Sequence, residues 1–236
     1  MATTKNPPQA AARLSKAAVV ERALALADEL GLEALTIRRL AQELGVTPMA
    51  LYWHFRSKEE LLAGLGDRVW AEIDVDIDPA ADWPAQLRGL LESLVQMLRA
   101  HPSASQLLLA GEKMHGEASI MATETALAVL RRAGFGPEQA SEIARSAMWT
   151  GLTLVMSEPG FDPSGTPEER TELMRQSRIR LAMLPPDRFP CVVEAAGPLT
   201  ACDDPDFHYQ FGIDLFIAGV VAVSASPRSP GASAGS

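Results

Sequence analysis

Residues 36–58 read TIRRLAQELGVTPMALYWHFRSK, and this stretch decides the fold. Thr36 is a favoured helix N-cap, and apolar residues recur at helical spacing from there to Gly45, which predicts a short helix. Thr47 caps a second helix, and Pro48 fills its first position, where a missing N–H costs nothing. Two helices joined by a tight turn containing glycine are typical of a helix-turn-helix, in which one helix rests on the DNA backbone while the next enters the major groove.

Helical periodicity continues on both sides of this motif. An apolar stripe that begins after Ser15 and ends at Gly31 predicts a preceding helix. Ser57 opens the capping sequence SKEE, and the apolar stripe behind it predicts a longer helix that leads away from the motif. Residues 1–14 are polar and rich in Ala, so we expect a flexible arm, and residues 15–78 form the first predicted domain.

The rest of the chain keeps the helical period, with no alternating strand pattern of useful length. We therefore expect an all-α protein with a second helical domain over residues 79–223. The helices predicted there, with their connecting stretches, are 83–100, 103–110, 117–132, 137–157, 167–184, an irregular or lid-like segment at 185–205, and 206–223, followed by a disordered tail at 224–236.

The composition is that of a soluble globular protein, with 236 residues, 47% of them hydrophobic, and a formal charge of −9. Two cysteines make no disulfide framework, the N-terminus lacks the apolar stretch of a secretory signal, and no long apolar run is present, so we expect a cytoplasmic protein without membrane association. The charge is uneven, because residues 1–60 hold eight Lys and Arg against seven acids, a net of +1, and the remainder carries −10. This asymmetry favours a basic face on the helix-turn-helix.

With the preceding helix, residues 36–58 resemble the DNA-binding domain of the tetracycline-repressor (TetR) family of bacterial regulators. The resemblance is carried by L-A-x-x-L-G-V, L-Y-W-H-F and S-K-x-x-L-L, in this order and spacing. Phe207 to Gly219 and the helix at 137–157 are similar, more weakly, to the ligand and dimerisation domain of the tetracycline-repressor subgroup. The resemblance implies a ligand-responsive regulator, more often a repressor than an activator, that binds palindromic double-stranded operator DNA.

The same resemblance assigns DNA contacts to side chains on or beside the two helices. The expected contacts are Thr36, Arg38, Arg39, Thr47, Pro48, Met49, Tyr52, Trp53, His54 and Lys58. Of these, Thr47, Pro48 and Met49 lie nearest the base edges, Arg38 or Arg39 reads guanine, and Thr36, Tyr52, His54 and Lys58 contact phosphates. Trp53 is expected to combine backbone contact with packing. Partial burial in the small domain is the alternative for Tyr52 and Trp53, and Leu51 and Phe55 are expected in its core. The tip of the reading helix lacks Gln, Asn and Arg, so direct readout is expected to use the Thr47 hydroxyl and contacts with thymine methyl groups.

An effector pocket is implied among the middle helices. Its expected lining is apolar and rich in sulfur, with a few polar groups: Trp83, Gln86, Met97, Met114, His115, Met148, Trp149, Thr153 and Met156. Such a lining fits a large flat hydrophobic ligand, and ordinary core packing is the alternative for each Met and Trp. The two histidines through which the tetracycline repressor binds its drug and magnesium align near Asp74 and Leu108 here. We therefore expect no metal or cofactor, and an antibiotic-like or aromatic polyketide effector in place of magnesium–tetracycline.

The helices at 137–157 and 206–223 are apolar on more than one face. The resemblance implies that they form a four-helix bundle with a second copy of the chain, so that two recognition helices lie about 34–36 Å apart on DNA. Two further classes stay open, each with a vestigial helix-turn-helix: a helical small-molecule carrier and an enzyme. The enzyme finds little support, because the histidines and cysteines show no metal-binding spacing and no nucleophile elbow, phosphate loop or dinucleotide fingerprint occurs.

Overall fold

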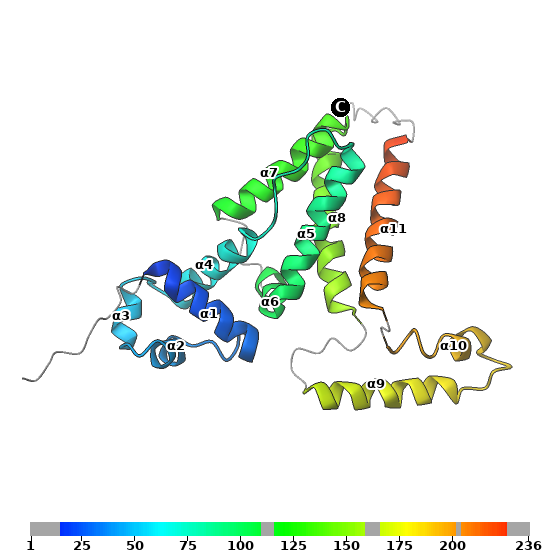
Figure 1. Ribbon diagram of the computed structural model, residues 1–236, viewed down its shortest axis with the longest axis horizontal. Helices are drawn as coiled ribbons and strands as arrows, with labels where there is room; N and C mark the ends of the chain where they lie inside the picture. Colours follow the sequence, from blue (N-terminus) through cyan, green and yellow to red (C-terminus); the bar gives the residue numbers. More distant parts are fainter. Residues whose placement is uncertain (1–14, 110–115, 159–165, 202–203, 226–236) are drawn as a thin grey trace, which may run out of the picture.

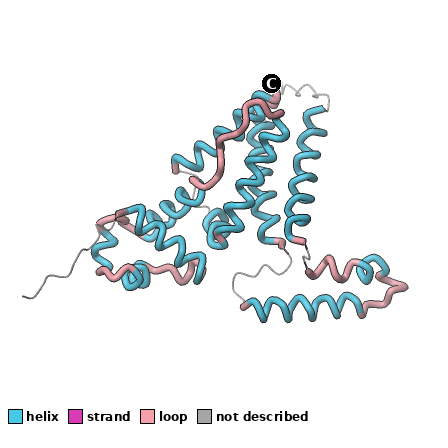
Figure 2. The backbone as a smooth tube through the Cα atoms, in the orientation of Figure 1, coloured by secondary structure: helices cyan, strands magenta, loops and turns pink. Residues whose placement is uncertain are grey.

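The computed structural model describes residues 15–109, 116–158, 166–201 and 204–225. Within these ranges every regular element is a helix (Figures 1 and 2), which confirms the predicted all-α class. The helices are α1 (Lys16–Leu30), α2 (Ile37–Glu43), α3 (Pro48–Tyr52), α4 (Lys58–Trp70), α5 (Trp83–Ala100), α6 (Pro102–Leu109), α7 (Glu117–Arg132), α8 (Pro137–Met156), α9 (Pro167–Ala182), α10 (Pro190–Glu194) and α11 (Pro205–Ala225). The predicted arm at residues 1–14 lies outside the described residues, as do Met114, His115 and residues 226–236 of the predicted tail.

Helices α1 to α4 enclose one small core at one end of the molecule (Figure 1). Leu40, Leu51, Phe55 and Leu65 are almost completely buried there, against the apolar face of α1. The sharp turn between α2 and α3 depends on Gly45, whose φ of +66° lies in the region that side chains other than glycine rarely adopt. A five-residue helix such as α3 is too short to persist alone, so this core is what holds it in place.

Four longer helices, α5, α7, α8 and α11, form the second core. Helix α5 packs against the other three. The approach of α8 to α5 requires Gly151, because a Cβ atom at that position would lie 2.9 Å from Cδ2 of Leu94. Helix α11 is tied to α5 by the ion pair of Arg88 with Asp214. These contacts make α5 the central element of the domain.

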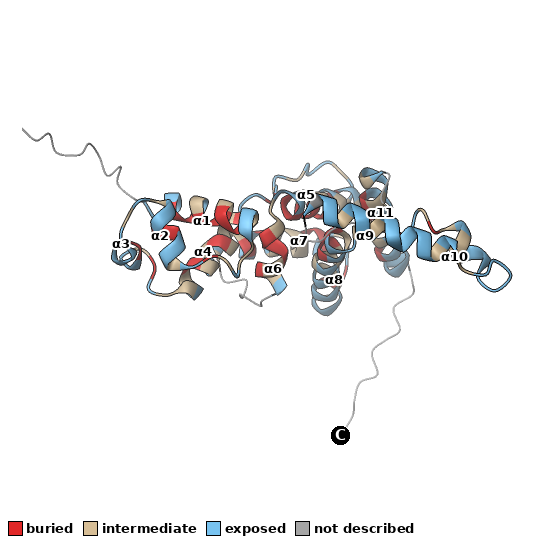
Figure 3. Ribbon diagram, turned by 90° about the horizontal axis from the view of Figure 1, so that it is seen from below, coloured by how far each residue is buried: buried red, intermediate tan, exposed pale blue. Residues whose placement is uncertain are grey.

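Helices α9 and α10 lie beside one another, apart from the upright bundle (Figure 1). Their surfaces are largely exposed (Figure 3). The stretch at 185–205, predicted to be irregular or a lid, contains α10, so irregular structure is wrong over Pro190–Glu194 and the lid stays a prediction. Helix α10 begins at Pro190, and proline at the first helical position presets the backbone for a helical turn. The number of prolines in this stretch had favoured irregular structure instead.

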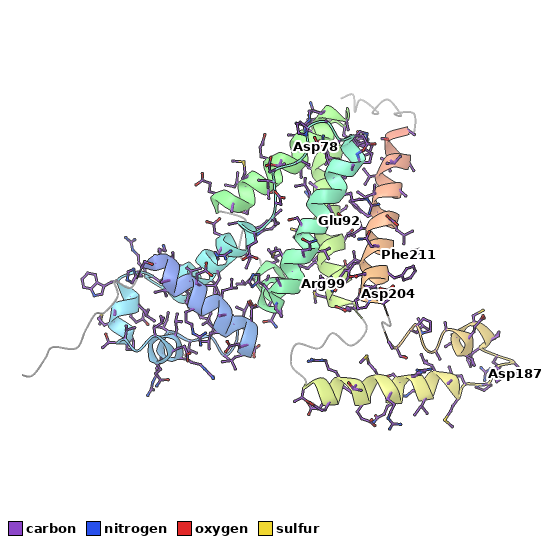
Figure 4. All side chains as sticks on the ribbon, viewed as in Figure 1. Asp78, Glu92, Arg99, Asp187, Asp204 and Phe211 are labelled. Carbon is purple, nitrogen blue, oxygen red and sulfur yellow. The ribbon has the colours of Figure 1, made fainter. Side chains whose placement is uncertain are left out.

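Helix α11 leaves an apolar row uncovered. Phe207, Phe211 and Leu215 are spaced four residues apart, and each is more than half exposed. Figure 4 shows Phe211 on the side of α11 that faces away from α5 and α8. By length and composition α11 is also the one helix of the described residues that could cross a membrane, although such a test is also passed by apolar helices of soluble proteins.

Candidate nucleic-acid interface and internal pocket

The short helix α3 presents large side chains to solvent. Trp53 is 85% exposed, Met49 is 67% exposed and Tyr52 is 49% exposed. Thr47 and Pro48 are exposed as well, whereas Leu51, between Met49 and Tyr52 in the sequence, is buried and anchors the helix. An exposed aromatic and apolar surface on a rigidly seated helix is suited to enter a groove. Of the two residues for which partial burial was the alternative, Tyr52 is about half buried and Trp53 is largely exposed.

Some of the Lys and Arg side chains in the helix-turn-helix domain are not engaged in ion pairs within the described part of the protein. Lys16, Arg22 and Arg68 of α1 and α4 form ion pairs with carboxylates of the same domain. Arg38 and Arg39, in contrast, form none of the ion pairs found among the described residues. They border a shallow polar depression with Thr36 and Gln42 on α2. Lys58 at the start of α4 likewise forms none of those ion pairs. Unpaired guanidinium and ammonium groups on one surface are the complement of phosphate charge.

The threonine hydroxyls on this face cap helices. Thr36 Oγ1 accepts a hydrogen bond from the Arg39 backbone N–H at 3.2 Å, and Thr47 Oγ1 accepts one from Ala50 N–H at 3.3 Å. Each hydroxyl uses its oxygen as an acceptor in the cap, so its hydrogen stays free to donate. Both threonines can therefore stabilise a helix and donate to DNA at the same time.

A second candidate site is a pocket of about 360 Å³ between the end of α4 and the helices α5, α7 and α8 of the other domain. Four helices contribute side chains to its lining: Trp70 of α4, Ile73 just after α4, Leu87, Leu90, Leu91 and Leu94 of α5, Ala122, Thr123, Ala126 and Leu127 of α7, and Ser141, Ala144, Arg145, Ala147, Met148 and Trp149 of α8. The volume is in the range of small-molecule sites, and the lining is predominantly apolar.

Met148 and Trp149, both predicted from the sequence, lie in this lining. The other described residues of the predicted set do not. Trp83 packs edge-on against Phe135, with ring centroids 5.6 Å apart, and Met97 is buried in the core. Gln86 is buried, and its amide nitrogen donates to the carbonyl oxygens of Asp78 and Ala81, so it fixes the linker before α5.

The last two predicted residues, Thr153 and Met156, lie near the C-terminal end of α8. Thr153 donates its hydroxyl to the carbonyl of Trp149 on the preceding turn. Met156 is exposed near the end of the helix. The structure thus brings together two of the predicted pocket residues and leaves five described ones outside the lining. The lining residues that the sequence did not predict are mainly Ala and Leu. The one sequence feature that could have indicated them is the four-residue spacing of Ala122 and Ala126, which places both on one face of α7.

A polar network connects the two domains. Asp28 of α1 accepts hydrogen bonds from the Ser103 N–H at 3.1 Å and from the Ser103 hydroxyl at 2.6 Å, at the start of α6. The ring of His101 lies between two carboxylates, with Nδ1 2.7 Å from Asp28 and Nε2 2.9 Å from Glu72, just after α4. Glu72 also pairs with Arg68. This network joins α1, α4 and α6.

Both ring nitrogens of His101 must donate to satisfy two carboxylates, so the network favours the imidazolium form. Burial opposes the charge, but the hydrogen bonds to Asp28 and Glu72 outweigh it and raise the pKa of His101 above its usual value. A raised pKa in the folded state means that the stabilisation is complete below the pKa of the unfolded chain and is lost as pH rises through the folded pKa.

We therefore expect His101→Gln to lower the free energy of unfolding by about 1–3 kcal/mol near pH 6, the range for buried charge-assisted hydrogen bonds. The difference from the wild type should shrink as the pH is raised to 8.5. Urea unfolding at several pH values measures it, with His54→Gln on the surface as the control. An equal loss at every pH would show that folding does not raise the pKa of His101.

Both candidate sites lie in parts of the chain that match known proteins. Residues 19–65 match the model of bacterial regulatory proteins of the tetR family, and residues 77–224 match the tetracyclin repressor-like C-terminal domain. Tetracycline repressor protein class A from transposon 1721 of Escherichia coli is 33% identical over 152 residues, 64% of this chain and 69% of that protein.

Two further proteins resemble nearly the whole chain. The HTH-type transcriptional repressor DrrR1 of Streptomyces coeruleorubidus is 29% identical over 235 residues, 91% of this chain and 80% of that protein. The crystal structure of ActR from Streptomyces coelicolor in complex with actinorhodin superposes with a TM-score of 0.78 at 28% identity, covering 91% of this chain and 99% of ActR. The likeness thus extends through both candidate sites.

Proposed function

The chain belongs to the TetR family of bacterial regulators, with a tetracycline-repressor-like C-terminal domain, and from this premise we propose that it is a repressor released from its operator by a hydrophobic small molecule. Members of this family are ligand-responsive, DNA-binding transcriptional regulators, not enzymes. We place the protein in the cytoplasm and assign it to genes of efflux or biosynthesis. The observation that carries the proposal is α4, which begins at Lys58 beside the exposed reading helix and ends at Trp70 in the pocket lining.

The DNA contacts proposed are the ten residues expected from the sequence. The exposure of Met49 and Trp53 and the unpaired charge of Arg38 and Arg39 support them. Thr47, Pro48 and Met49 serve base readout together with Arg38 or Arg39. Thr36, Tyr52, His54 and Lys58 contact phosphates. Because one such domain contacts only a few base pairs, specific binding to a palindromic operator needs two copies.

We propose that the second copy docks on α8 and α11. A groove lined mostly by apolar side chains runs between these helices, with Ile143 of α8 and Leu215, Phe216 and Val220 of α11 among its lining. The exposed row of Phe207, Phe211 and Leu215 continues this surface. Burial of this face against a second copy removes the exposed apolar area that a lone chain would present to water. We assign the face to protein and not to lipid.

The effector proposed is an antibiotic-like or aromatic polyketide molecule. Support comes from the apolar lining of the pocket and from ActR, whose solved complex contains actinorhodin. The positions near Asp74 and Leu108 offer no imidazole for a magnesium–tetracycline complex, and the Asp74 backbone N–H donates to the Ser93 hydroxyl. An effector that fills the pocket displaces the end of α4 and, through it, both reading helices. Such a ligand shifts the equilibrium only by binding the released form more tightly.

DNA binding is tested by fluorescence anisotropy with duplexes from the DNA that flanks the protein's own gene. We expect tight binding at low salt and a steep loss with added salt, with a log–log slope of several units. Lys58→Ala should weaken binding to every sequence and reduce the slope by about 1, whereas Thr47→Ala should change the preference among sequences. Arg178→Ala on α9 is the matched control, because it removes a cation far from α3. A failure to bind any flanking duplex at low salt overturns the proposed function.

A further inference from the structure

The rim of the internal pocket carries an arginine and a tryptophan side by side. Arg145 and Trp149 are four residues apart on α8, so they lie on one face of the helix. Both belong to the pocket lining, yet Trp149 is 49% exposed and the Arg145 side chain is 57% exposed. Residues that line a cavity and also face solvent mark its mouth. The mouth therefore combines a flat aromatic surface with a positive charge.

Arg145 is the one charged residue among the described residues of the lining, and its ion pair with Glu142 is exposed to solvent. The guanidinium pairs with Glu142 at 2.7 Å, three residues back on α8. The Glu142 side chain is 68% exposed in the single chain and also borders the groove assigned to the second copy. Solvent-exposed pairs of this kind contribute little to stability, so the guanidinium can exchange Glu142 for another anion. An anion that also lies against the apolar lining is better shielded from water than Glu142 is.

The two hydroxyl groups of the lining do not compete for an anion. The Ser141 hydroxyl donates to the Pro137 carbonyl at 2.8 Å, and the Thr123 hydroxyl donates to the Ser119 carbonyl at 2.8 Å. Their hydrogens are already engaged within their own helices. An acidic group on a bound ligand therefore finds its charged donor in Arg145.

We propose that the pocket takes a planar aromatic acid, with the ring system among the leucines of α5, one ring against Trp149 and the anionic group on Arg145. The proposal rests on the proposed function, because it names the effector class of the same pocket. Arg145 supplies charge recognition and Trp149 supplies a stacking surface, which also favours the cation beside it. An uncharged aromatic of the same shape keeps the apolar contacts and loses the charged one.

Two fluorescent dyes with the same rings test this. The probes are 8-anilinonaphthalene-1-sulfonate, which is anionic, and N-phenyl-1-naphthylamine, which lacks the sulfonate. We expect Arg145→Gln to weaken binding of the anionic dye about tenfold, the effect of losing one charge-assisted hydrogen bond. The neutral dye should bind the variant as it binds the wild type. Arg145→Lys should restore part of the affinity for the anionic dye.

Arg175→Gln is the matched control, because Arg175 forms an exposed pair with Glu172 at 2.7 Å and the same spacing on α9. It should change neither affinity. Filling the pocket with Ala126→Trp, or with the smaller Ala126→Met if the first variant misfolds, should weaken both dyes and so locate them in the pocket. An Arg145→Gln variant that binds both dyes like the wild type, or loses both equally, overturns the proposal.

Dye binding that ignores the Ala126 variants also overturns it, because the dyes would then occupy another surface. In each of these cases the anisotropy assay with operator duplexes is read separately. If DNA binding is retained, the protein is still a DNA-binding regulator and only the assignment of an aromatic-acid effector is wrong. If the wild-type protein does not bind the operator duplexes, the proposed function itself is wrong.

Discussion

The double variant Phe211→Asp, Leu215→Asp will sediment as a monomer and bind operator DNA at least about a hundredfold more weakly than the wild type, because one half-site contact alone gives little affinity. Both side chains are more than half exposed on α11, and they lie one turn apart on the same face. Two carboxylates on each copy would be buried without partners in a two-fold interface, which repels the second copy strongly. Sedimentation velocity at micromolar concentration and anisotropy with the operator duplex measure the two effects.

The control for this pair is Ile120→Asp on α7, an equally exposed apolar side chain on a different helix. It should leave both the sedimentation coefficient and the DNA affinity unchanged. Because the substituted side chains are on the surface, the variant should keep the helical content of the wild type by circular dichroism. A double variant that stays dimeric and binds DNA normally would show that the second copy docks elsewhere. Co-flotation of the wild type with lipid vesicles would assign the row to a membrane instead.

The helix-turn-helix could be predicted closely because its signals are local. Thr36, Thr47 and Ser57 were predicted to cap their helices, and each side chain accepts the hydrogen bond of a cap. Gly45 was predicted to end the second helix, and its positive φ follows from the chain direction needed to begin α3. In the second domain, apolar periodicity predicted every helix except α10 to within a few residues.

The pocket was harder to predict, because it depends on what the packed helices leave unfilled. Chemical type alone predicts Met97 and Trp83 in the pocket, whereas Met97 is buried in the core and Trp83 packs against it. The space arises where α7 and α8 present small side chains, such as Ala126 and Ala144, toward α5. The spacing of residues along one helix does not predict which alanine faces an unfilled space and which faces a leucine of a neighbouring helix.

Long-range polar contacts left no trace in the sequence at all. Asp28 and His101 are separated by 73 positions, and neither belongs to a motif. Their pairing is a consequence of how α6 packs against α1 and α4. The same holds for the ion pair of Arg88 with Asp214 across α5 and α11. The Asp28–His101 contact joins the two domains, so the connection between the DNA-binding domain and the pocket is what local sequence patterns describe least.

Two aromatic residues in the motif, Trp53 and Phe55, separate folding from recognition. Phe55 is 1% exposed, and the Lys16 ammonium lies 5.1 Å from its ring centroid. Phe55→Ala should lower the free energy of unfolding by about 3–5 kcal/mol, because a large cavity opens in a core too small to collapse around it. With α3 no longer anchored, DNA binding should be lost together with the fold of this domain. Urea unfolding followed by circular dichroism measures the loss.

Trp53→Ala is the matched change on the outside of the same turn. With 85% of Trp53 exposed, the substitution should alter the free energy of unfolding by no more than about 0.5 kcal/mol. It should still weaken operator binding about tenfold, since a large aromatic at the edge of the reading helix contributes contact area that alanine lacks. Equal destabilisation by both substitutions would place Trp53 in the core. An unchanged DNA affinity for Trp53→Ala would remove it from the interface. If Phe55→Ala lowers stability and Trp53→Ala lowers only DNA affinity, Phe55 anchors the helix-turn-helix in the domain core and Trp53 contacts DNA.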